Sequence, residues 1–334
     1  MTVWSEIQPL KSVVLGNVFK TDDLLSCLNL SEKWAAPFRE INQKAEQELD
    51  SIAELLNDFR IIVYRPKIYN IKSDIGLVSP PLSPRDWLLS YGDEVLVGNE
   101  ASLNHHVRTH STDHLIKDPL RMPHHDRWSD IAFNNLNDAS LARPYLHMAN
   151  VIRCGMDVFL TQHPDTSGNK LGQEWIIQKL KNINKDVRIH MVNCESHLDG
   201  YIFLVKPGLM LSSLPKSLLP DYFAKWDVII VDEKVEVYRK SMLYKWKKLN
   251  PIVAAEYAWF LQSNPAETMF SINGLLINDS TVMLPGRSPK VFRELDKRGI
   301  NCISVDMRAL SYWDSGLHCC TSELERQGGL EDYS

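Results

Sequence analysis

One order of secondary-structure elements, two short strands followed by a helix and a third strand, recurs three times along this chain. The first copy spans residues 151–192, with helical spacing of apolar side chains over residues 171–183. The second copy spans residues 201–231, with a helix expected near residues 217–225, and the third copy spans residues 273–305. A chain that repeats one small unit buries its core by placing the units side by side, so the repeat predicts an α/β ring of pseudo-symmetric ββαβ units.

The N-terminal part follows the same order less regularly. We expect strands at residues 12–15, 61–64 and 94–97, and a long helix whose apolar face is marked over residues 34–56. A doubly wound nucleotide-binding sheet is disfavoured, because no Gly-x-Gly-x-x-Gly stretch follows a strand. An α+β domain with incidental hairpins remains the alternative. Because no linker divides the chain, residues 1–334 are predicted to form one domain.

The charge and apolar patterning of the chain exclude several classes of protein. Its 37 basic and 42 acidic side chains give a net charge of −5, so no basic surface indicates a nucleic-acid partner. No apolar run is long enough to cross a membrane, and the N-terminus lacks the features of a secretory signal, so we expect a cytoplasmic protein. Six cysteines without a Cys-x-x-Cys pair indicate neither a disulfide scaffold nor a zinc site.

Three polar clusters, at residues 84–87, 195–199 and 316–321, lie next to strands or apolar runs. The last of them contains Cys319 beside Cys320. Equivalent loops of a ring meet near its axis, so side chains that are far apart in the sequence would share one pocket. Cysteine, histidine and aspartate together are what a thiolate nucleophile needs, because the imidazole moves the thiol proton and a carboxylate binds a cationic substrate.

Taken together, these segments resemble the amidinotransferase family, which includes glycine amidinotransferase and the amidinotransferases of cyanobacterial and streptomycete natural-product pathways. The matching stretches occur in the family's order and extend from residue 4 to residue 321. They are the entry segment from Trp4 to Gly16, Pro84-Arg85-Asp86, the Ile-Arg-x-Gly-x-Asp-x-Phe stretch from Ile152 to Phe159, Leu171-Gly172-x-Glu174-Trp175, His197-x-Asp199, Ser271-x-Asn273 and Gly316-x-His318-Cys319. The resemblance implies a five-bladed α/β-propeller of ββαβ units, the pentein-like fold.

The resemblance also implies roles for individual residues. Cys319 would be the nucleophile and His197 the general acid and base, while Asp86 and Asp199 would bind the guanidinium group of the donor. We expect Cys320 to be a neighbour only, because adjacent side chains of an extended segment point to opposite sides.

Three positions depart from the family pattern around the donor. His147 and Asn150 stand where carboxylates are expected, and Lys216 stands where an arginine would bind the α-carboxylate of the donor. Lysine cannot make the bidentate fork of arginine, and an imidazole or amide brings no negative charge to a guanidinium. Arg85 is a candidate for compensating these losses, and Ser271 of the Ser-x-Asn stretch completes the predicted substrate-binding set.

The sequence therefore favours a cysteine-dependent transferase of natural-product biosynthesis that moves an amidino group from a guanidine donor such as L-arginine to an amine acceptor. The group would pass through a covalent intermediate on Cys319. Two alternatives stay open: a transferase or hydrolase that uses a non-guanidino acyl or thioester donor, and a binding protein that has lost catalysis. No cofactor is expected, the partners are the two small molecules, and a homodimer stays open.

A group of histidines raises the question of a metal site. His106, His110 and His114 would share one face if their segment were helical, and such a face can bind zinc. No carboxylate or cysteine lies at ligand spacing on that face, so no metal site is predicted.

Overall fold

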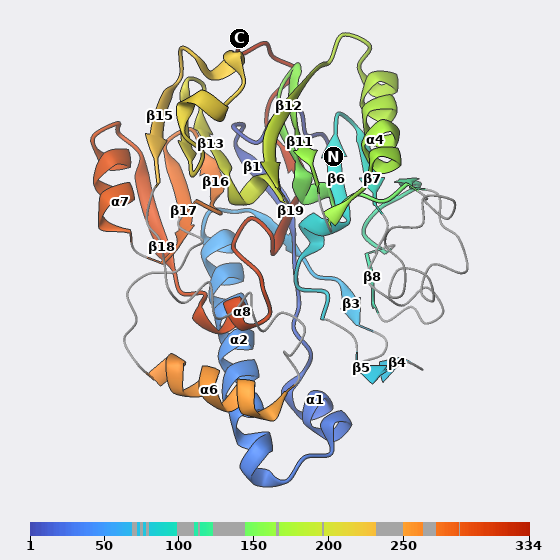
Figure 1. Ribbon diagram of the computed structural model, residues 1–334, viewed down its shortest axis with the longest axis vertical. Coiled ribbons are helices and arrows are strands. Elements are labelled where there is room, and N and C mark those ends of the chain that lie inside the picture. The colour runs from blue at the N-terminus through green and yellow to red at the C-terminus, as the bar shows by residue number, and fades with distance from the viewer. Residues whose placement is uncertain are drawn as a thin grey trace.

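Five three-stranded sheets form the blades of the protein in a computed structural model (Figure 1). The structure describes residues 1–68, 72–73, 76–77, 80–98, 110–112, 114–122, 144–164, 167–195, 197–231, 250–262, 272–286 and 288–334. The sheets have the strand orders β19-β1-β2, β6-β7-β9, β10-β11-β12, β13-β14-β15 and β16-β17-β18. In each, the middle strand is antiparallel to its first neighbour and parallel to its second. The predicted five-bladed propeller of ββαβ units is confirmed.

The three repeats expected from the sequence form the third, fourth and fifth blades. Their strands are β10 (Val151–Cys154), β11 (Asp157–His163), β12 (Arg188–Glu195), β13 (Ile202–Lys206), β14 (Leu209–Ser212), β15 (Asp227–Ile230), β16 (Leu275–Asn278), β17 (Thr281–Pro285) and β18 (Asn301–Val305). Helix α4 (Lys170–Ile183) joins β11 to β12, and α7 (Pro289–Asp296) joins β17 to β18. Both helices lie at the outer edge of the ring, on opposite sides of Figure 1.

The prediction of a helix at residues 217–225 of the fourth blade is wrong. Two single 3₁₀ turns stand in its place, η6 (Lys216–Leu218) and η7 (Asp221–Phe223). Pro220 separates them, because proline has no backbone N–H and keeps the residue before it out of the helical region.

The first blade joins the two ends of the chain. Strand β1 (Leu10–Leu15) pairs in parallel with β2 (Ile62–Tyr64) and antiparallel with the C-terminal strand β19 (Thr321–Arg326). Val13, Val14 and Leu15 are fully buried, as an inner strand with both faces covered requires. Pairing of the first and last strands closes the ring.

The second blade is the least regular. It contains β6 (Leu88–Tyr91), β7 (Glu94–Val97) and the two-residue strand β9 (Leu120–Arg121). Beside it, β3 (Lys67–Ile68) pairs with β8 (His110–Ser111), and β4 (Lys72–Ser73) pairs with β5 (Gly76–Leu77). His110 thus belongs to a strand and His114 to a turn, so the helical face considered for these histidines is absent here, and His106 lies outside the described residues.

A group of helices projects from one side of the ring, at the bottom of Figure 1. The long helix α2 (Glu32–Asp58) contacts α1 (Thr21–Leu28), α6 (Pro251–Gln262) and α8 (Arg308–Tyr312). Its buried face contains the apolar positions that marked the predicted helix, among them Phe38, Ile41, Ala45, Leu49, Ile52 and Leu56. Within the described ranges, no helix has the length and apolar character needed to cross a membrane.

A buried ion network joins the blades at their inner ends. Glu323 on β19 accepts hydrogen bonds from Arg85, from Arg153 on β10 at 2.6 Å, and from Arg326 at 3.0 Å. Arg153 also donates to Glu6 at 2.9 Å. All five side chains are buried. Although burial alone would raise the pKa of Glu323, the surrounding arginines lower it well below its usual value, so the carboxylate stays charged.

The network predicts a large stability loss when its central charge is removed. Because the buried arginines would lose their shared partner, we expect Glu323→Gln to lower the free energy of unfolding by about 3–5 kcal/mol. Asp227→Asn, the same change at the exposed pair with Arg298, should cost less than about 1 kcal/mol. Urea unfolding followed by circular dichroism measures both variants. Equally small losses would contradict a supporting role for the network.

Candidate active site

Cys319 lies in a tight turn that Asn273 holds from the side. The Asn273 Oδ1 atom accepts hydrogen bonds from the backbone N–H groups of His318 at 2.8 Å and Cys319 at 3.2 Å. The Asn273 Nδ2 group donates to the Cys319 Sγ atom at 3.4 Å. Gly316 allows this approach, because a Cβ atom there would lie 2.2 Å from Asn273 Oδ1. The turn and Asn273 therefore fix where the sulfur atom points.

Asp199 connects the sulfur atom to the buried network. Its Oδ2 atom lies 3.4 Å from Cys319 Sγ and accepts a hydrogen bond from His318 Nδ1 at 2.9 Å. The other ring nitrogen of His318, Nε2, lies 3.3 Å from Glu6 Oε2. Burial and Arg85 oppose the protonation of His318, but Glu6 and Asp199 outweigh them and raise its pKa. His318 is therefore suited to carry a proton on each ring nitrogen and to hold Asp199 as a carboxylate.

The Cys319 thiol is strongly biased towards its neutral form. Burial is the largest cause, and the negative charges of Asp199 and Asp86 add to it, so the pKa of Cys319 rises well above its usual value. Only 8% of Cys319 is exposed. A reaction through its thiolate therefore needs something that offsets the nearby negative charge.

Two histidines and Asp86 form a second group at the site. The His197 Nε2 atom lies 2.7 Å from His147 Nδ1, and His147 Nε2 lies 2.9 Å from the Tyr145 hydroxyl. Asp86 approaches both rings, at 3.8 Å from His197 Nδ1 and 4.0 Å from His147 Nδ1. Asp86 also raises the pKa of Cys319, and the charge on His197 acts on Asp199, so both groups belong to one site.

Short 3₁₀ turns at the inner ends of three blades carry these side chains. Asp86 belongs to η1 (Pro84–Asp86), His147 precedes η3 (Met148–Asn150), and His197 precedes η5 (Leu198–Gly200), which contains Asp199. The middle turn, η3, contacts both η1 and η5. The backbone N–H of Arg85 donates to the carbonyl of Cys319 at 3.3 Å, which ties η1 to the cysteine turn.

Two of the predicted substrate-binding residues have structural roles instead. Arg85 is fully buried and paired with Glu323, so its guanidinium cannot compensate for a missing donor contact. Asn150 is also fully buried; its Nδ2 group donates to the carbonyl of Ser167 at 3.2 Å and to the Ser167 Oγ atom at 3.0 Å. Arg85 is thus used in the buried ion pair, and Asn150 holds the backbone at Ser167.

One further predicted residue, Lys216, does not join the cluster. Lys216 is exposed. The hydrogen bond from Arg298 is the largest cause that lowers the pKa of Asp227, and the charge of Lys216 lowers it further. Asp227 pairs with the first residue of β14, which lies beside the last residue of β13. His197 precedes the first residue of β13, so Lys216 acts at the opposite end of this pair of strands from His197. Ser271 lies outside the described residues.

The two neighbouring sulfur atoms have different surroundings. Cys320 is fully buried, its thiol donates to the carbonyl of Leu317 at 3.3 Å, and burial raises its pKa to about 12. Residues 317–320 form a turn, not the extended segment that the sequence argument assumed. The sulfur atoms still diverge, because Cys320 packs in the hydrophobic core while Cys319 faces Asp199.

Sequence reasoning did not assign roles to His318, Asn273 or Tyr145. His318 and Asn273 stand inside the quoted Gly-x-His-Cys and Ser-x-Asn stretches, so their position in a motif was a usable signal. Tyr145 carries no such signal, since only the fold brings its hydroxyl to His147.

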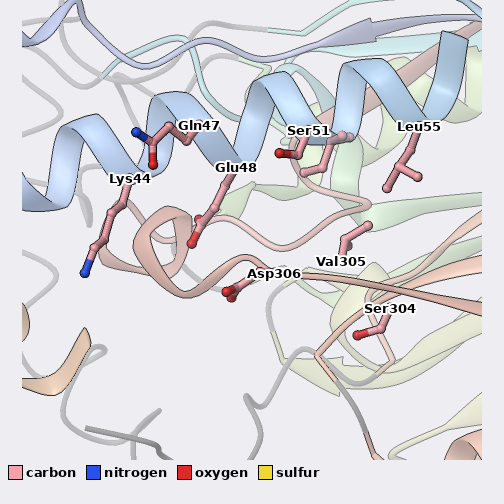
Figure 2. A pocket seen from close by; sticks show the side chains of 9 residues that line it. Lys44, Gln47, Glu48, Ser51, Leu55, Ser304, Val305 and Asp306 are labelled. Carbon is pink, nitrogen blue, oxygen red and sulfur yellow. The ribbon is translucent and has the colours of Figure 1, made fainter. Parts of the chain in front are cut away.

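A separate cavity of about 290 Å³ lies between α2 and the end of β18 (Figure 2). Glu48 on α2 faces it and accepts hydrogen bonds from the backbone N–H groups of Ala309 at 2.9 Å and Leu310 at 2.8 Å. Burial raises the pKa of Glu48 to about 7. None of the predicted site residues is among those that line this cavity.

Comparison with curated proteins finds relatives that align with most of the chain. A mitochondrial glycine amidinotransferase from Xenopus laevis is 22% identical over 328 residues, covering 87% of this chain and 71% of that protein. Inosamine-phosphate amidinotransferase 1 from Streptomyces glaucescens is 21% identical over 374 residues, covering 100% of this chain and 99% of that protein. No protein-family model matches the chain.

Comparison with solved structures identifies the same fold. The inosamine-phosphate amidinotransferase StrB1 from Streptomyces griseus superposes with a TM-score of 0.70 and 20% identity, over 99% of this chain and 98% of that one. SxtG, an amidinotransferase from Microseira wollei in the saxitoxin biosynthetic pathway, superposes with a TM-score of 0.71 and 17% identity, over 100% and 99%.

The position of Asp199 predicts the ionisation of Cys319. Removing a negative charge 3.4 Å from the sulfur atom favours the thiolate, so Asp199→Asn should lower the pH midpoint of Cys319 alkylation. Rates of iodoacetamide labelling, read at Cys319 by peptide mass spectrometry across pH, measure this. Asp227→Asn, at a surface carboxylate, is the matched control and should leave the midpoint unchanged. An unshifted or raised midpoint in Asp199→Asn would refute the assignment.

Proposed function

We propose that this protein, which belongs to the amidinotransferase family, transfers an amidino group from a guanidine donor to an amine acceptor through a covalent intermediate on Cys319. The observation that carries the proposal is the placement of a sulfur atom beside the Asp199 carboxylate, with His197 and Asp86 in the same site. A nucleophile, a proton carrier and two anions for a cationic donor are the groups that the reaction requires.

The first half-reaction loads the enzyme. Once the donor is bound, the Cys319 thiol gives its proton to His197. The thiolate attacks the central carbon of the donor guanidinium, a C–S bond forms, and the C–N bond to the leaving group breaks. The departing nitrogen takes a proton from His197 and leaves as an amine. In the second half-reaction, the acceptor amine attacks the same carbon and gives a proton to His197. The C–S bond then breaks, which returns the thiolate and completes a ping-pong cycle.

The donor itself supplies the charge that the thiolate needs. In the free protein, burial and the charges of Asp199 and Asp86 keep the pKa of Cys319 high. A guanidinium bound near these two carboxylates offsets their field, and a positive charge close to the sulfur atom favours the thiolate. The nucleophile is thus expected to ionise when a cationic donor is in place.

His147 supports a second candidate function, the transfer or hydrolysis of a non-guanidino acyl or thioester group. This imidazole contacts His197 at 2.7 Å, at the position where the family resemblance led us to expect a carboxylate. A neutral or cationic ring there attracts a guanidinium less than a carboxylate does. The same Cys319 and His197 would then form and resolve an acyl-enzyme with an uncharged donor.

Substitution of the two neighbouring cysteines tests the choice of nucleophile. Because only the Cys319 sulfur faces Asp199, we expect Cys319→Ala to abolish transfer and Cys320→Ala to retain most of it. Intact mass spectrometry after incubation with L-arginine, and in parallel with acyl thioesters, measures the adduct on each variant. An amidino adduct supports the first candidate and an acyl adduct the second. Equal loss of activity in a folded Cys320→Ala would show that the wrong sulfur had been chosen.

A second substitution tests the donor. His147→Asp restores a carboxylate next to His197, and one charge-assisted hydrogen bond contributes about 1.5–3 kcal/mol, so kcat/KM for L-arginine should rise roughly ten- to a hundredfold. Lys216→Arg is the matched control and should have no effect, because Lys216 is exposed and lies away from the cluster. If the native protein already turns arginine over with tight binding, the idea of an altered donor site is wrong.

A further inference from the structure

His318 is a buried histidine with a carboxylate at each ring nitrogen. Its Nδ1 atom lies 2.9 Å from Asp199 Oδ2, and its Nε2 atom lies 3.3 Å from Glu6 Oε2. Only 4% of the residue is exposed, so both contacts are shielded from water. A neutral imidazole has one N–H group and donates to one carboxylate only, whereas an imidazolium donates to both. The geometry therefore fits the charged form of the ring.

Neither carboxylate is suited to hold the proton in place of the ring. Burial alone would raise the pKa of Glu6, but Arg153 and His318 outweigh it and lower that pKa to about 2. Burial would also raise the pKa of Asp199, but the hydrogen bond and the charge of His318 lower it below its usual value. The proton that these three groups share therefore belongs on His318.

Two more charged groups of the buried network act on the ring. Burial and the charge of Arg85 oppose the protonation of His318. Burial raises the pKa of Glu323, and the charge on His318 adds to the arginines that lower it. The positive charge of His318 is thus part of the balance between cations and carboxylates inside the ring of blades.

The contacts of Asp199 connect His318 to the sulfur atom. The backbone N–H of His318 donates to Asn273 Oδ1 at 2.8 Å, which fixes the start of the ring side chain. Asp199 Oδ2, which accepts from His318, also lies 3.4 Å from Cys319 Sγ. The other oxygen, Asp199 Oδ1, is buried and has no hydrogen-bond partner among the described residues. His318 therefore holds one oxygen of Asp199 and leaves the second one for a donor cation.

We propose that His318 is a positioning residue of amidino transfer, whose imidazolium fixes the orientation and charge of Asp199 and acts through Asp199 on Cys319. The inference rests on the proposed function, in which Asp199 binds the donor and Cys319 attacks it. The imidazolium offsets part of the negative field of Asp199 at the sulfur atom. The site thereby keeps an anion for the guanidinium while the thiolate stays accessible.

The charge of the His318 ring is measurable without any substrate. ¹⁵N NMR of the full chain, labelled at its histidines, distinguishes rings that carry one proton from rings that carry two. The His318 signals are those missing from the spectrum of His318→Asn. We expect both ring nitrogens of His318 to be protonated at about pH 7.5, where a histidine with the ordinary pKa of about 6.5 is mostly neutral. A neutral His318 ring in the native chain would overturn the proposal.

His318→Asn separates the charge of the ring from its hydrogen bond. The asparagine amide can donate to Asp199 in place of Nδ1, but it has no charge. Loss of a positive charge beside Asp199 disfavours the thiolate, so iodoacetamide should label Cys319 at least about tenfold more slowly at a fixed pH of about 8.5. A merely structural role predicts the opposite, because a loosened turn would expose the sulfur atom and speed its labelling.

Two further variants complete the test, with circular dichroism as the check that each is folded. In the Asp199→Asn background, His318→Asn should slow labelling much less, because its effect passes through Asp199. His190→Asn is the matched control, since His190 bonds to the Asp157 carboxylate at 2.7 Å but lies on β12 outside the site, and its loss should leave labelling unchanged.

The outcomes separate this proposal from the proposed function. Faster labelling in a folded His318→Asn, or an equal effect with and without the Asp199 carboxylate, would overturn the role of His318. Absence of amidino transfer in a native chain whose His318 carries two ring protons would refute the proposed function, while the link from His318 through Asp199 to Cys319 would stand.

Discussion

The buried carboxylate of Glu323 is the charged group that links several blades of this ring. It belongs to the last strand of the chain, yet its partners come from the second blade through Arg85, the third through Arg153 and its own strand through Arg326. Arg326 in turn donates to the carbonyl of Leu276 in the fifth blade at 3.1 Å. Removing these charges from water costs free energy, and only their mutual pairing offsets that cost. The arrangement of blades that brings the charged groups together is therefore favoured over other arrangements.

The same network positions the reactive groups. Arg85 is fully buried and pairs with Glu323. Its backbone N–H donates a hydrogen bond to the carbonyl of Cys319. Glu6, which pairs with Arg153, lies against one side of the His318 ring, and Asp199 accepts from the other side. The charged groups of the buried network and those of the candidate active site thus contact one another in succession, and the last of them, Asp199, contacts the sulfur atom of Cys319.

Three features of the fold and site were predictable from residues alone because they depend on short-range order. The period of two in the strands and of 3.6 in α2 and α4 predicted elements close to those observed. The repeated order of those elements predicted blades. The polar stretches after the strands predicted that Asp86, Asp199, His197 and Cys319 would meet, since equivalent loops of a ring converge.

The sequence by itself determined the repeat, the apolar face of α2 and which polar side chains stand at the inner ends of strands, because these follow from local spacing. Only the tertiary structure decided how the polar groups are used. Arg85 is a buried ion-pair partner, Asn150 holds a backbone turn, and His147 contacts His197 and Tyr145. Each outcome depends on partners from distant segments, and a hydrogen bond or ion pair forms only where the fold brings both groups within about 3 Å.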